Sequence, residues 1–425
     1  MSAAATGAAA CVVVALPPRD VTADRAALAD LARRYLVFDA FAGGEPRVSA
    51  EPLVLSRALH EAAVAAARSA YRLVSAVASR GFTDAREGDC YGLPDDVRAL
   101  AEASFAAGDR GGLCRVDLLL REDDTFAACE LNSDCPGGLN EAEALPAMAR
   151  ARGFDRGFSP SRVLAAMTGR MAEHVAALGG ERVALLFATA YAEDLQVAAL
   201  VARALRARGL ETILTTPTAP KLVGGRACVR GAPVSLLYRF FPTEGMSSQA
   251  NVPGLAAAVS AGTLRSFSAF SEVLSQSKLA MARAHETSAE LVPAARAELE
   301  ATVPRTLSLG RALRPELLGD RAGWVLKRDF GRVGDQVFVG ALLTDAEWLG
   351  IVDEALAHVA AVREIWIAQR YVPQHTIATP WGQRYLTLGA YLLDGEFVGY
   401  FARLTEVSHV SHDALVVPVF VAGDA

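Results

Sequence analysis

The stretch from Leu113 to Asn140 constrains the fold more than any other part of the chain. It reads as two strands joined by a tight turn at Asp123-Asp124. Side chains two positions apart on a strand point to the same face of a sheet. One face of this hairpin therefore carries four polar groups, which are Arg115, Asp117, Glu130 and Asn132.

The register of the hairpin decides which of these groups meet. A two-residue turn sets Asp117 opposite Glu130 and Arg115 opposite Asn132. Two facing carboxylates repel each other and weaken a sheet. A bound cation replaces this repulsion by attraction, because carboxylate and amide oxygens are ligands that Mg2+ takes. The turn lacks the glycine that two-residue hairpins prefer, and a three-residue loop would misalign the pair. An ordinary hairpin with a solvated acidic face is the alternative.

The pattern Arg-x-Asp … Glu-x-Asn-x-x-x-Pro-Gly resembles the Mg-ATP site of the ATP-grasp ligases. D-alanine–D-alanine ligase has a similar segment, and glutathionylspermidine synthase has closer variants. The resemblance implies that Asp117, Glu130 and Asn132 hold Mg2+. It implies a catalytic role for Arg115, whose charge would stabilise an acyl phosphate and an oxyanion.

Composition and charge narrow the class of protein. The 425 residues are 52% hydrophobic and 21% charged, which indicates a globular chain of two or three subdomains. A net charge of −6 argues against nucleic-acid binding. No run reaches the roughly 18 apolar residues of a membrane helix, and no basic segment precedes the apolar run Cys11–Leu16. We therefore expect a short strand there, and a cytoplasmic protein that binds no membrane.

Cysteine and histidine spacing does not indicate a metal centre. The six cysteines include no Cys-x-x-Cys pair, so a zinc site is not expected and the thiols should be reduced. His409 and His412 lie in a loop-like segment that does not favour a metal pair. A Gly-x-Ser-x-Gly hydrolase elbow is absent from the sequence. The roles of Cys135 and of both histidines stay open.

The few lysines are informative. Lys221, Lys278 and Lys327 are the only lysines among 42 basic residues, so the other 39 are arginine. A lysine retained in such a chain marks a place that needs a compact ammonium, for which guanidinium is a poor substitute. Lys327 ends a strand-like run before a loop that contains Gly331 and Gly334, and glycines let backbone N–H groups approach phosphates closely. An ordinary hairpin is the alternative.

The resemblance to ATP-grasp enzymes assigns further residues to ATP. These enzymes use two lysines on a mobile lid at the α- and β-phosphates, which implies this role for Lys278 and Lys327. The run Ile365–Pro373 resembles the hinge that reads adenine, and Leu237–Glu244 resembles a segment of glutathionylspermidine synthase. The implied ATP-binding residues are Lys278, Lys327, Gly331, Gly334, Gln369, Tyr371, Arg403 and Glu244.

The order of these parts resembles the permuted arrangement of glutathionylspermidine synthase, because the Glu-x-Asn strand precedes the lysines. We expect an α/β (α+β) fold, namely an ATP-grasp core with a permuted order of subdomains plus a Rossmann-like parallel α/β domain. Residues 1–180 would form a helical region and the metal-binding half of the core. Residues 181–263 would form the Rossmann-like domain, in which strand and helix patterns alternate. Residues 264–425 would supply the lysine-bearing lid and the remaining core.

The resemblance implies an ATP-dependent carboxylate–amine ligase that forms an amide through an acyl phosphate, with ATP and Mg2+ as cofactors. Its substrates would be a small-molecule or peptide carboxylate and an amine. The alternatives are a phosphotransferase that uses the same ATP site and a non-catalytic nucleotide-binding module. The identity of the acid and of the amine, the pathway and the oligomeric state stay open.

Overall fold

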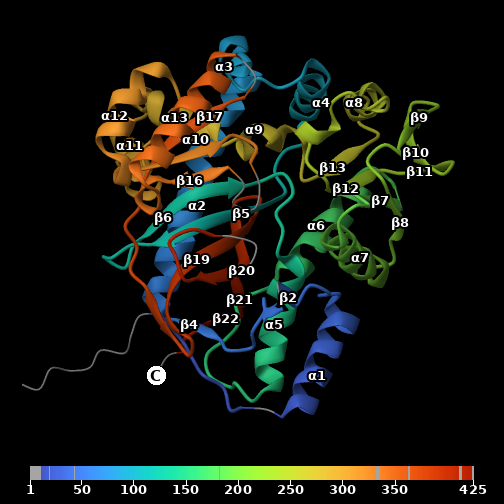
Figure 1. Ribbon diagram of the computed structural model, residues 1–425. Coiled ribbons are helices and arrows are strands. Elements are labelled where there is room, and N and C mark those ends of the chain that lie inside the picture. The colour runs from blue at the N-terminus through green and yellow to red at the C-terminus, as the bar shows by residue number, and fades with distance from the viewer. Residues whose placement is uncertain are drawn as a thin grey trace, which may run out of the picture.

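The polar hairpin lies at one edge of a six-stranded antiparallel sheet in the computed structural model, which describes residues 11–18, 20–42, 44–180, 182–331, 336–361, 364–410 and 414–423. The strand order is β21-β20-β19-β5-β6, and β18 pairs with β19. Figure 1 shows β5 and β6 side by side with strands from the C-terminal end of the chain. The strands are β5 (Leu113–Leu120), β6 (Phe126–Asn132), β18 (Ile377–Thr379), β19 (Gly382–Leu393), β20 (Glu396–Thr405) and β21 (Leu415–Val417).

The loop of the hairpin has three residues rather than two. The Arg121 N–H donates to the Thr125 carbonyl at 2.9 Å, which leaves residues 122–124 as the loop. Asp124 has φ +59°, the left-handed conformation that commonly ends a three-residue hairpin loop. The predicted two-residue turn at Asp123-Asp124 is therefore wrong.

A β-bulge at Cys129 offsets the extra loop residue. The register shifts between Asp117 and Leu118, so that Cys129 has no partner on β5. Beyond the bulge, Asp117 pairs with Glu130 as predicted from the sequence. The extra loop residue and the bulge each shift the register by one residue, and the two shifts cancel. The four polar groups therefore keep a common face.

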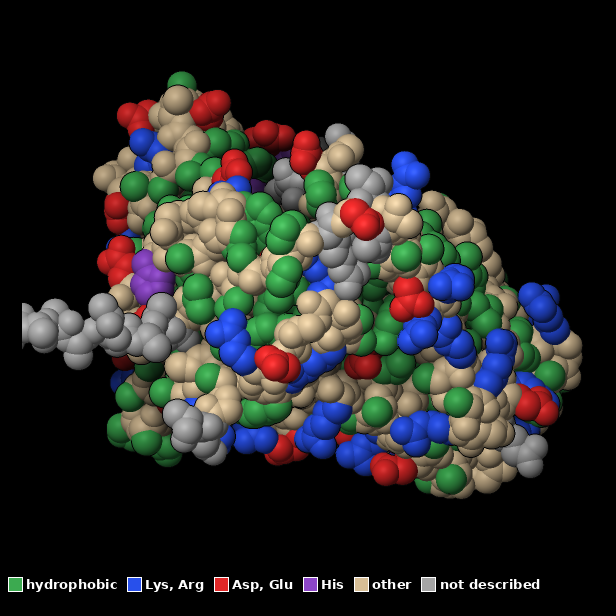
Figure 2. Space-filling view, turned by 90° about the horizontal axis from the view of Figure 1, so that it is seen from below, with side chains coloured by type: hydrophobic (Ala, Val, Ile, Leu, Met, Phe, Trp, Pro, Cys, Tyr) green, Lys and Arg blue, Asp and Glu red, His purple; other side chains and the backbone are tan. Residues whose placement is uncertain are grey.

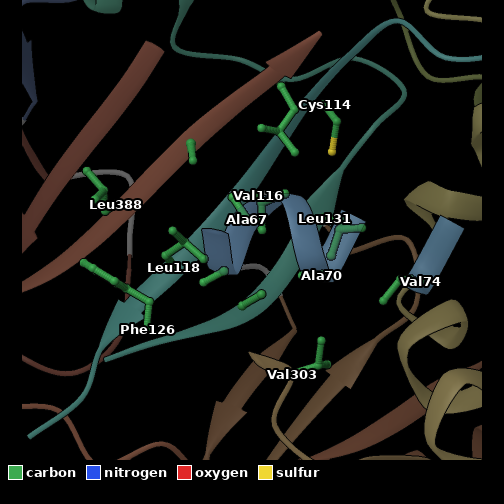
Figure 3. Packing of buried hydrophobic residues seen from close by; sticks show 14 of the residues in the cluster. Ala67, Ala70, Val74, Cys114, Val116, Leu118, Phe126, Leu131, Val303 and Leu388 are labelled. Atoms are coloured by element: carbon green, nitrogen blue, oxygen red, sulfur yellow. The ribbon is translucent and has the colours of Figure 1, made fainter. Parts of the chain in front are cut away.

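Helix α2 (Arg57–Ser79) covers the other face of this sheet. Its first turn is capped by Ser56, whose hydroxyl accepts a hydrogen bond from the Leu59 N–H at 3.2 Å. Figure 3 shows small side chains of α2, Ala67 and Ala70, against Val116 of β5 and its neighbours. These apolar residues alternate along the strands with the polar ones. Burial of the apolar face thus directs the polar face away from α2.

A second sheet is parallel and has the order β13-β12-β7-β8. Its central strand β7 is apolar and buried on both sides, as parallel strands usually are. Helices α6, α7 and α8 accompany this sheet (Figure 1). The bounds are α6 (Val163–Ala177), β7 (Arg182–Phe187), α7 (Ala192–Ala207), β8 (Glu211–Thr215), β12 (Leu236–Phe240), α8 (Val252–Ser260) and β13 (Arg265–Phe267).

A third sheet carries Lys327 and has the order β14-β17-β15-β16. Lys327 lies in a hairpin, since β15 pairs with β16. Helix α13 begins at a capping box formed by Thr344 and Glu347, and its Trp348 lies in the core of this unit. The bounds are β14 (Thr306–Ser308), α12 (Arg314–Gly319), β15 (Trp324–Arg328), β16 (Val337–Val339), α13 (Asp345–Ala360) and β17 (Trp366–Arg370).

The helical segment from Val273 to Glu286 is broken at Ser277-Lys278. The Asp329 carboxylate accepts hydrogen bonds from the Ser277 hydroxyl at 2.7 Å and from the Leu279 N–H at 3.0 Å. Asp329 therefore caps the second piece from a distant part of the chain, which sequence periodicity does not reveal. The two pieces are α9 (Val273–Gln276) and α10 (Leu279–Glu286).

A small sheet joins both ends of the described chain, because β4 lies between β1 and β22. None of the described helices is long and apolar enough to span a bilayer. Figure 2 shows basic and acidic side chains interspersed on one face of the molecule. The remaining elements are β1 (Cys11–Val13), α1 (Val21–Asp30), β2 (Phe41–Ala42), β3 (Glu45–Pro46), β4 (Leu53–Leu55), α3 (Ala85–Cys90), α4 (Asp95–Ala106), α5 (Leu139–Ala151), β9 (Lys221–Val223), β10 (Arg226–Val229), β11 (Ala232–Pro233), α11 (Pro293–Thr302) and β22 (Val419–Val421).

Candidate active site

Arg115 and Asp117 form a paired unit on β5. The Arg115 guanidinium donates to both Asp117 oxygens, at 2.7 Å from Nε and 3.0 Å from Nη2. Its Nη1 donates to the Gly137 carbonyl at 2.9 Å. Gly389 of β19 leaves room for this arrangement, because a Cβ there would lie 2.7 Å from Arg115 Cδ. The side chain is thus fixed at three points.

Arg403 reaches the same carboxylate from β20. Its Nη2 lies 2.6 Å from Asp117 Oδ2, and the Asn132 amide lies 3.4 Å from that oxygen. Burial tends to raise the pKa of Asp117, but the charges of Arg115 and Arg403 outweigh it and hold the pKa well below its usual range. Asp117 therefore remains ionised at any physiological pH.

Lys278 brings a distant part of the chain to the hairpin. Its ammonium lies 2.9 Å from Glu130 Oε1 and donates to the carbonyls of Asp329 and Gly331, at 3.0 Å and 2.8 Å. Burial raises the pKa of Glu130, whereas the charge of Lys278, and more weakly that of Lys327, lowers it, and the pKa stays below its ordinary value. The Glu130 carboxylate and the Lys278 ammonium therefore form one charge cluster.

Lys327 contacts the bulge on β6. Its ammonium donates to the Cys129 carbonyl at 2.9 Å and to Gln369 Oε1 at 2.7 Å, and only 6% of the residue is exposed. Gln369 is itself fixed, since its amide donates to the Thr306 hydroxyl at 3.0 Å. The structure thus brings Lys278 and Lys327 to the strand that carries Glu130 and Asn132.

Comparison with known families agrees with this geometry. A profile of the family described as glutathionylspermidine synthase preATP-grasp matches residues 23–422. The chain belongs to this family. It is accordingly an ATP-dependent ligase, and ligases of this family act on small molecules.

One solved structure supports the fold assignment. A glutathione synthetase-like effector from Globodera pallida, in its apo form, superposes with a TM-score of 0.60 at 10% identity, over 95% of this chain and 98% of that one. A putative gamma-glutamylcysteine synthetase from Methylobacillus flagellatus gives a TM-score of 0.39 at 14% identity, over 76% of this chain and 82% of that one. A search of curated protein sequences finds no match. The predicted ATP-grasp fold with a parallel α/β domain is confirmed.

The polar groups of the cluster fit the cofactors of this ligase family, which uses ATP and Mg2+. No group of three His, Cys, Asp or Glu side chains suited to a metal occurs among the described residues. Mg2+ does not need one, because it is usually held by one or two carboxylates together with phosphate oxygens and waters. Asp117, Glu130 and Asn132 supply two carboxylates and an amide, and Glu130 and Asn132 remain partly exposed.

Three more of the residues predicted to bind ATP can be placed in the structure, and a fourth cannot. Gly331 contributes its carbonyl to Lys278, whereas Gly334 lies outside the described residues. The Tyr371 hydroxyl donates to Ser408 Oγ at 3.0 Å, at the segment that includes His409. Glu244 begins a short 3-10 helix after β12.

His409 has an unexpected position. Burial lowers its pKa, and the Lys327 charge lowers it further, so the imidazole lies within the field of the site. His412 lies outside the described residues. No spacing in the sequence distinguishes His409 from an ordinary loop histidine.

Sequence reasoning also missed the buried anchor of the hairpin. Asp134 accepts hydrogen bonds from Arg239 Nη2 at 2.8 Å, from the Thr243 N–H at 2.6 Å and from the Thr243 hydroxyl at 2.8 Å. Arg239 and Asp134 are both almost fully buried. Arg239 follows a strand-like run and Asp134 follows Asn132 by two residues, but neither pattern predicts the pairing. This pair joins the end of β6 to the parallel sheet.

Proposed function

We propose that the protein joins a carboxylate to an amine by forming an acyl phosphate from ATP. The observation that carries the proposal is the contact of Lys278 with Glu130 across 148 positions of sequence. Each half of the site is incomplete alone. The β5–β6 hairpin has oxygens of the kind that bind Mg2+ but no ammonium group, whereas the segments with Lys278 and Lys327 have ammonium groups but no such set of oxygens. A triphosphate needs both kinds of group.

The charges of the cluster suit this task. Arg115, Arg403, Lys278 and Lys327 are four cations, and Asp117 and Glu130 are two anions, which leaves two positive charges. This surplus matches a net charge of about −2 on an ATP–Mg2+ complex. ATP would supply the phosphoryl group that makes the carboxylate reactive, and Mg2+ held by Asp117, Glu130 and Asn132 would offset phosphate charge.

The roles of the chain follow from their positions. Asp117, Glu130 and Asn132 would hold Mg2+, and Lys278 and Lys327 would offset phosphate charge. Arg115, fixed in a buried site, would stabilise the oxyanion that forms when the amine attacks. Arg403 would contact phosphate, Gly331 and Gly334 would line it, and Gln369 and Tyr371 would border the adenine. Glu244 would lie on the substrate side.

The proposed division of labour among segments follows the predicted boundaries. Residues 1–180 supply the metal-binding half with its helical cover, 181–263 the substrate-side parallel sheet, and 264–425 the lysine-bearing lid with the remaining core. The buried Asp134–Arg239 pair supports a fixed placement of the first two. A cytoplasmic location, with its supply of ATP, suits such a reaction.

The test is ADP release by the whole protein, screened against a matrix of amino acids, short peptides and polyamines, with products identified by mass spectrometry. A ligase yields ADP, phosphate and an amide only when acid and amine are both present. A stable phosphorylated product would instead identify a phosphotransferase. Binding of ATP without turnover across the matrix would indicate a non-catalytic module.

Glu130→Gln provides the matched variant for this assay. The amide keeps the shape of the side chain but loses the charge that pairs with Lys278, so turnover should fall by about 10²–10³ or more while the fold persists. Glu122→Gln, in the exposed loop of the same hairpin, is the control and should retain activity. Equal activity in both variants would contradict the assignment of Glu130.

A further inference from the structure

A pocket of about 580 Å³ lies away from the charge cluster of Asp117, Glu130 and Lys278. Its walls come from α2, from the segment that precedes β5, from α6 and from the start of β13. None of the residues assigned above to ATP or Mg2+ lines it. Its volume falls within the roughly 300–1,000 Å³ of small-molecule sites.

The pocket lies beside the end of the parallel sheet where β12 and β13 begin. Arg265, which lines the pocket, pairs with Leu236, the first residue of β12. Thr243, which binds Asp134 of the hairpin, lies three residues beyond Phe240, the last residue of β12. A ligand in the pocket would therefore be distinct from one bound beside Asp117.

The guanidinium groups of the pocket differ in their ionic partners. Arg170 pairs with Asp394 at 2.7 Å, and Arg72 also has a carboxylate partner. Arg110 and Arg265 form no ion pair among the described residues. Arg110 instead lies over the Phe105 ring, with its Cζ 3.8 Å from the ring centroid. A guanidinium can bind a carboxylate through two parallel hydrogen bonds, so each of these groups is suited to a carboxylate.

A buried acceptor belongs to a residue in the wall of this pocket. Asp109 is 2% exposed and lines the pocket, and its Oδ2 accepts the Ser266 N–H at 3.0 Å. Its Oδ1 is buried and has no hydrogen-bond partner in the described structure. Glu272 lines the pocket as well and accepts the Gly111 N–H at 2.9 Å. Burial raises the pKa of Asp109 to about 6 and that of Glu272 to about 7, so a cation placed here would be favourable for both.

We infer that this pocket binds a small zwitterion with one ammonium group and one or more carboxylates, such as an amino acid or a short peptide. Its carboxylate would pair with Arg110 and Arg265. Its ammonium would donate to Asp109 Oδ1 and lie beside Glu272. The inference is independent of the proposed ligase reaction, because it requires neither ATP nor turnover.

The test is isothermal titration of the whole protein without ATP. L-glutamate and glycylglycine are the zwitterions, glutarate lacks the ammonium, and cadaverine lacks the carboxylate. At least one zwitterion should bind about tenfold or more tightly than both glutarate and cadaverine. Binding of none of the four, or binding of glutarate as tight as that of the zwitterions, would overturn the inference.

Variants then place the binding. Arg110→Gln, at an exposed position, and Arg265→Gln should each weaken zwitterion binding by about tenfold or more. Arg226→Gln, on an exposed part of β10, is the control and should bind normally. Glu130→Gln should also bind normally, whereas loss of binding in Glu130→Gln with retention in Arg110→Gln would place the ligand in the active site and refute the pocket. Circular dichroism confirms that each variant is folded.

Discussion

Lys327 illustrates at the scale of one residue why this chain keeps so few lysines. Its ammonium fits between two oxygens, the Cys129 carbonyl and Gln369 Oε1, in a nearly closed position. A guanidinium is planar and larger, and its five donors would need partners that this position does not provide. The retained lysine is thus explained by shape as well as by charge.

Lys327→Arg should therefore impair the enzyme although it conserves charge. We expect the rate of ADP release to fall by about 10²–10³, the typical effect of losing one positioned charge. Lys221→Arg, on the exposed strand β9, should leave the rate unchanged. An active Lys327→Arg variant with an unchanged melting temperature would show that the ammonium has no special role.

Glu272 provides a prediction about pH. Burial raises its folded-state pKa to about 7, above the ordinary value of an unfolded chain. The folded protein then holds the extra proton between about pH 4.5 and 7, so this group makes stability fall as pH rises through that window. The loss is complete above pH 7 and amounts to roughly 3 kcal/mol at most.

Glu272→Gln should therefore flatten the pH dependence, because the neutral amide can still accept the Gly111 N–H. Urea unfolding at pH 5 and pH 8 measures the effect. We expect the variant to gain stability relative to the natural chain at pH 8 and to gain little at pH 5. A gain of equal size at both pH values would exclude the titration of Glu272 as its cause.

At the scale of elements, the Asp134–Arg239 pair holds the end of β6 against β12. Every oxygen of Asp134 has a donor, and Arg239 also donates to Ser266 Oγ at 2.7 Å and to the Ser268 carbonyl at 2.8 Å. Removing one partner of a buried pair leaves an uncompensated charge. The position of the hairpin relative to the parallel sheet depends on this link.

Asp134→Ala should destabilise the protein by about 3–5 kcal/mol, since Arg239 would be left buried and unpaired. Chemical denaturation gives the free energy of unfolding. Asp353→Ala, which breaks the exposed pair with Arg314, is the control and should cause little change. Similar effects of the two substitutions would show that the buried pair is not a structural anchor.

The sequence predicted some elements for physical reasons and missed others for equally physical ones. The pairing of Asp117 with Glu130 was predicted from a two-residue turn that the structure does not have. Alternation of apolar and polar residues defined both strands of the hairpin. It could not reveal that a longer loop and a bulge cancel, because both leave the alternation intact at the site. The break at Ser277 and the Asp134–Arg239 pair depend on groups that are distant in sequence, and local patterns carry no information on such contacts.

At the scale of the whole molecule, the chain crosses between its parts several times. β5 from the first third pairs with β19 from the last, and β4 pairs with β22. Phe420 of β22 is fully buried and stacks edge-on against Phe154, with ring centroids 4.8 Å apart. The C-terminal strand is therefore part of the core that supports the site.

Phe420→Ala should lower the free energy of unfolding by about 3–5 kcal/mol, the usual effect of removing a buried aromatic ring. Phe38→Ala removes the same ring from a position that is 58% exposed and should have little effect. Thermal melts of both variants make the comparison. Equal melting temperatures would show that β22 is not needed for the core.

The distribution of lysines also has a practical consequence for chemical labelling. Lys278 and Lys327 are 3% and 6% exposed, whereas Lys221 lies on an exposed strand beside the parallel sheet. Amine-reactive dyes should therefore modify one lysine side chain, Lys221, in the folded protein. A fluorophore at that position would lie on the parallel-sheet side of the molecule, far in sequence from Lys327, and would follow motion of that part without touching Lys278 or Lys327.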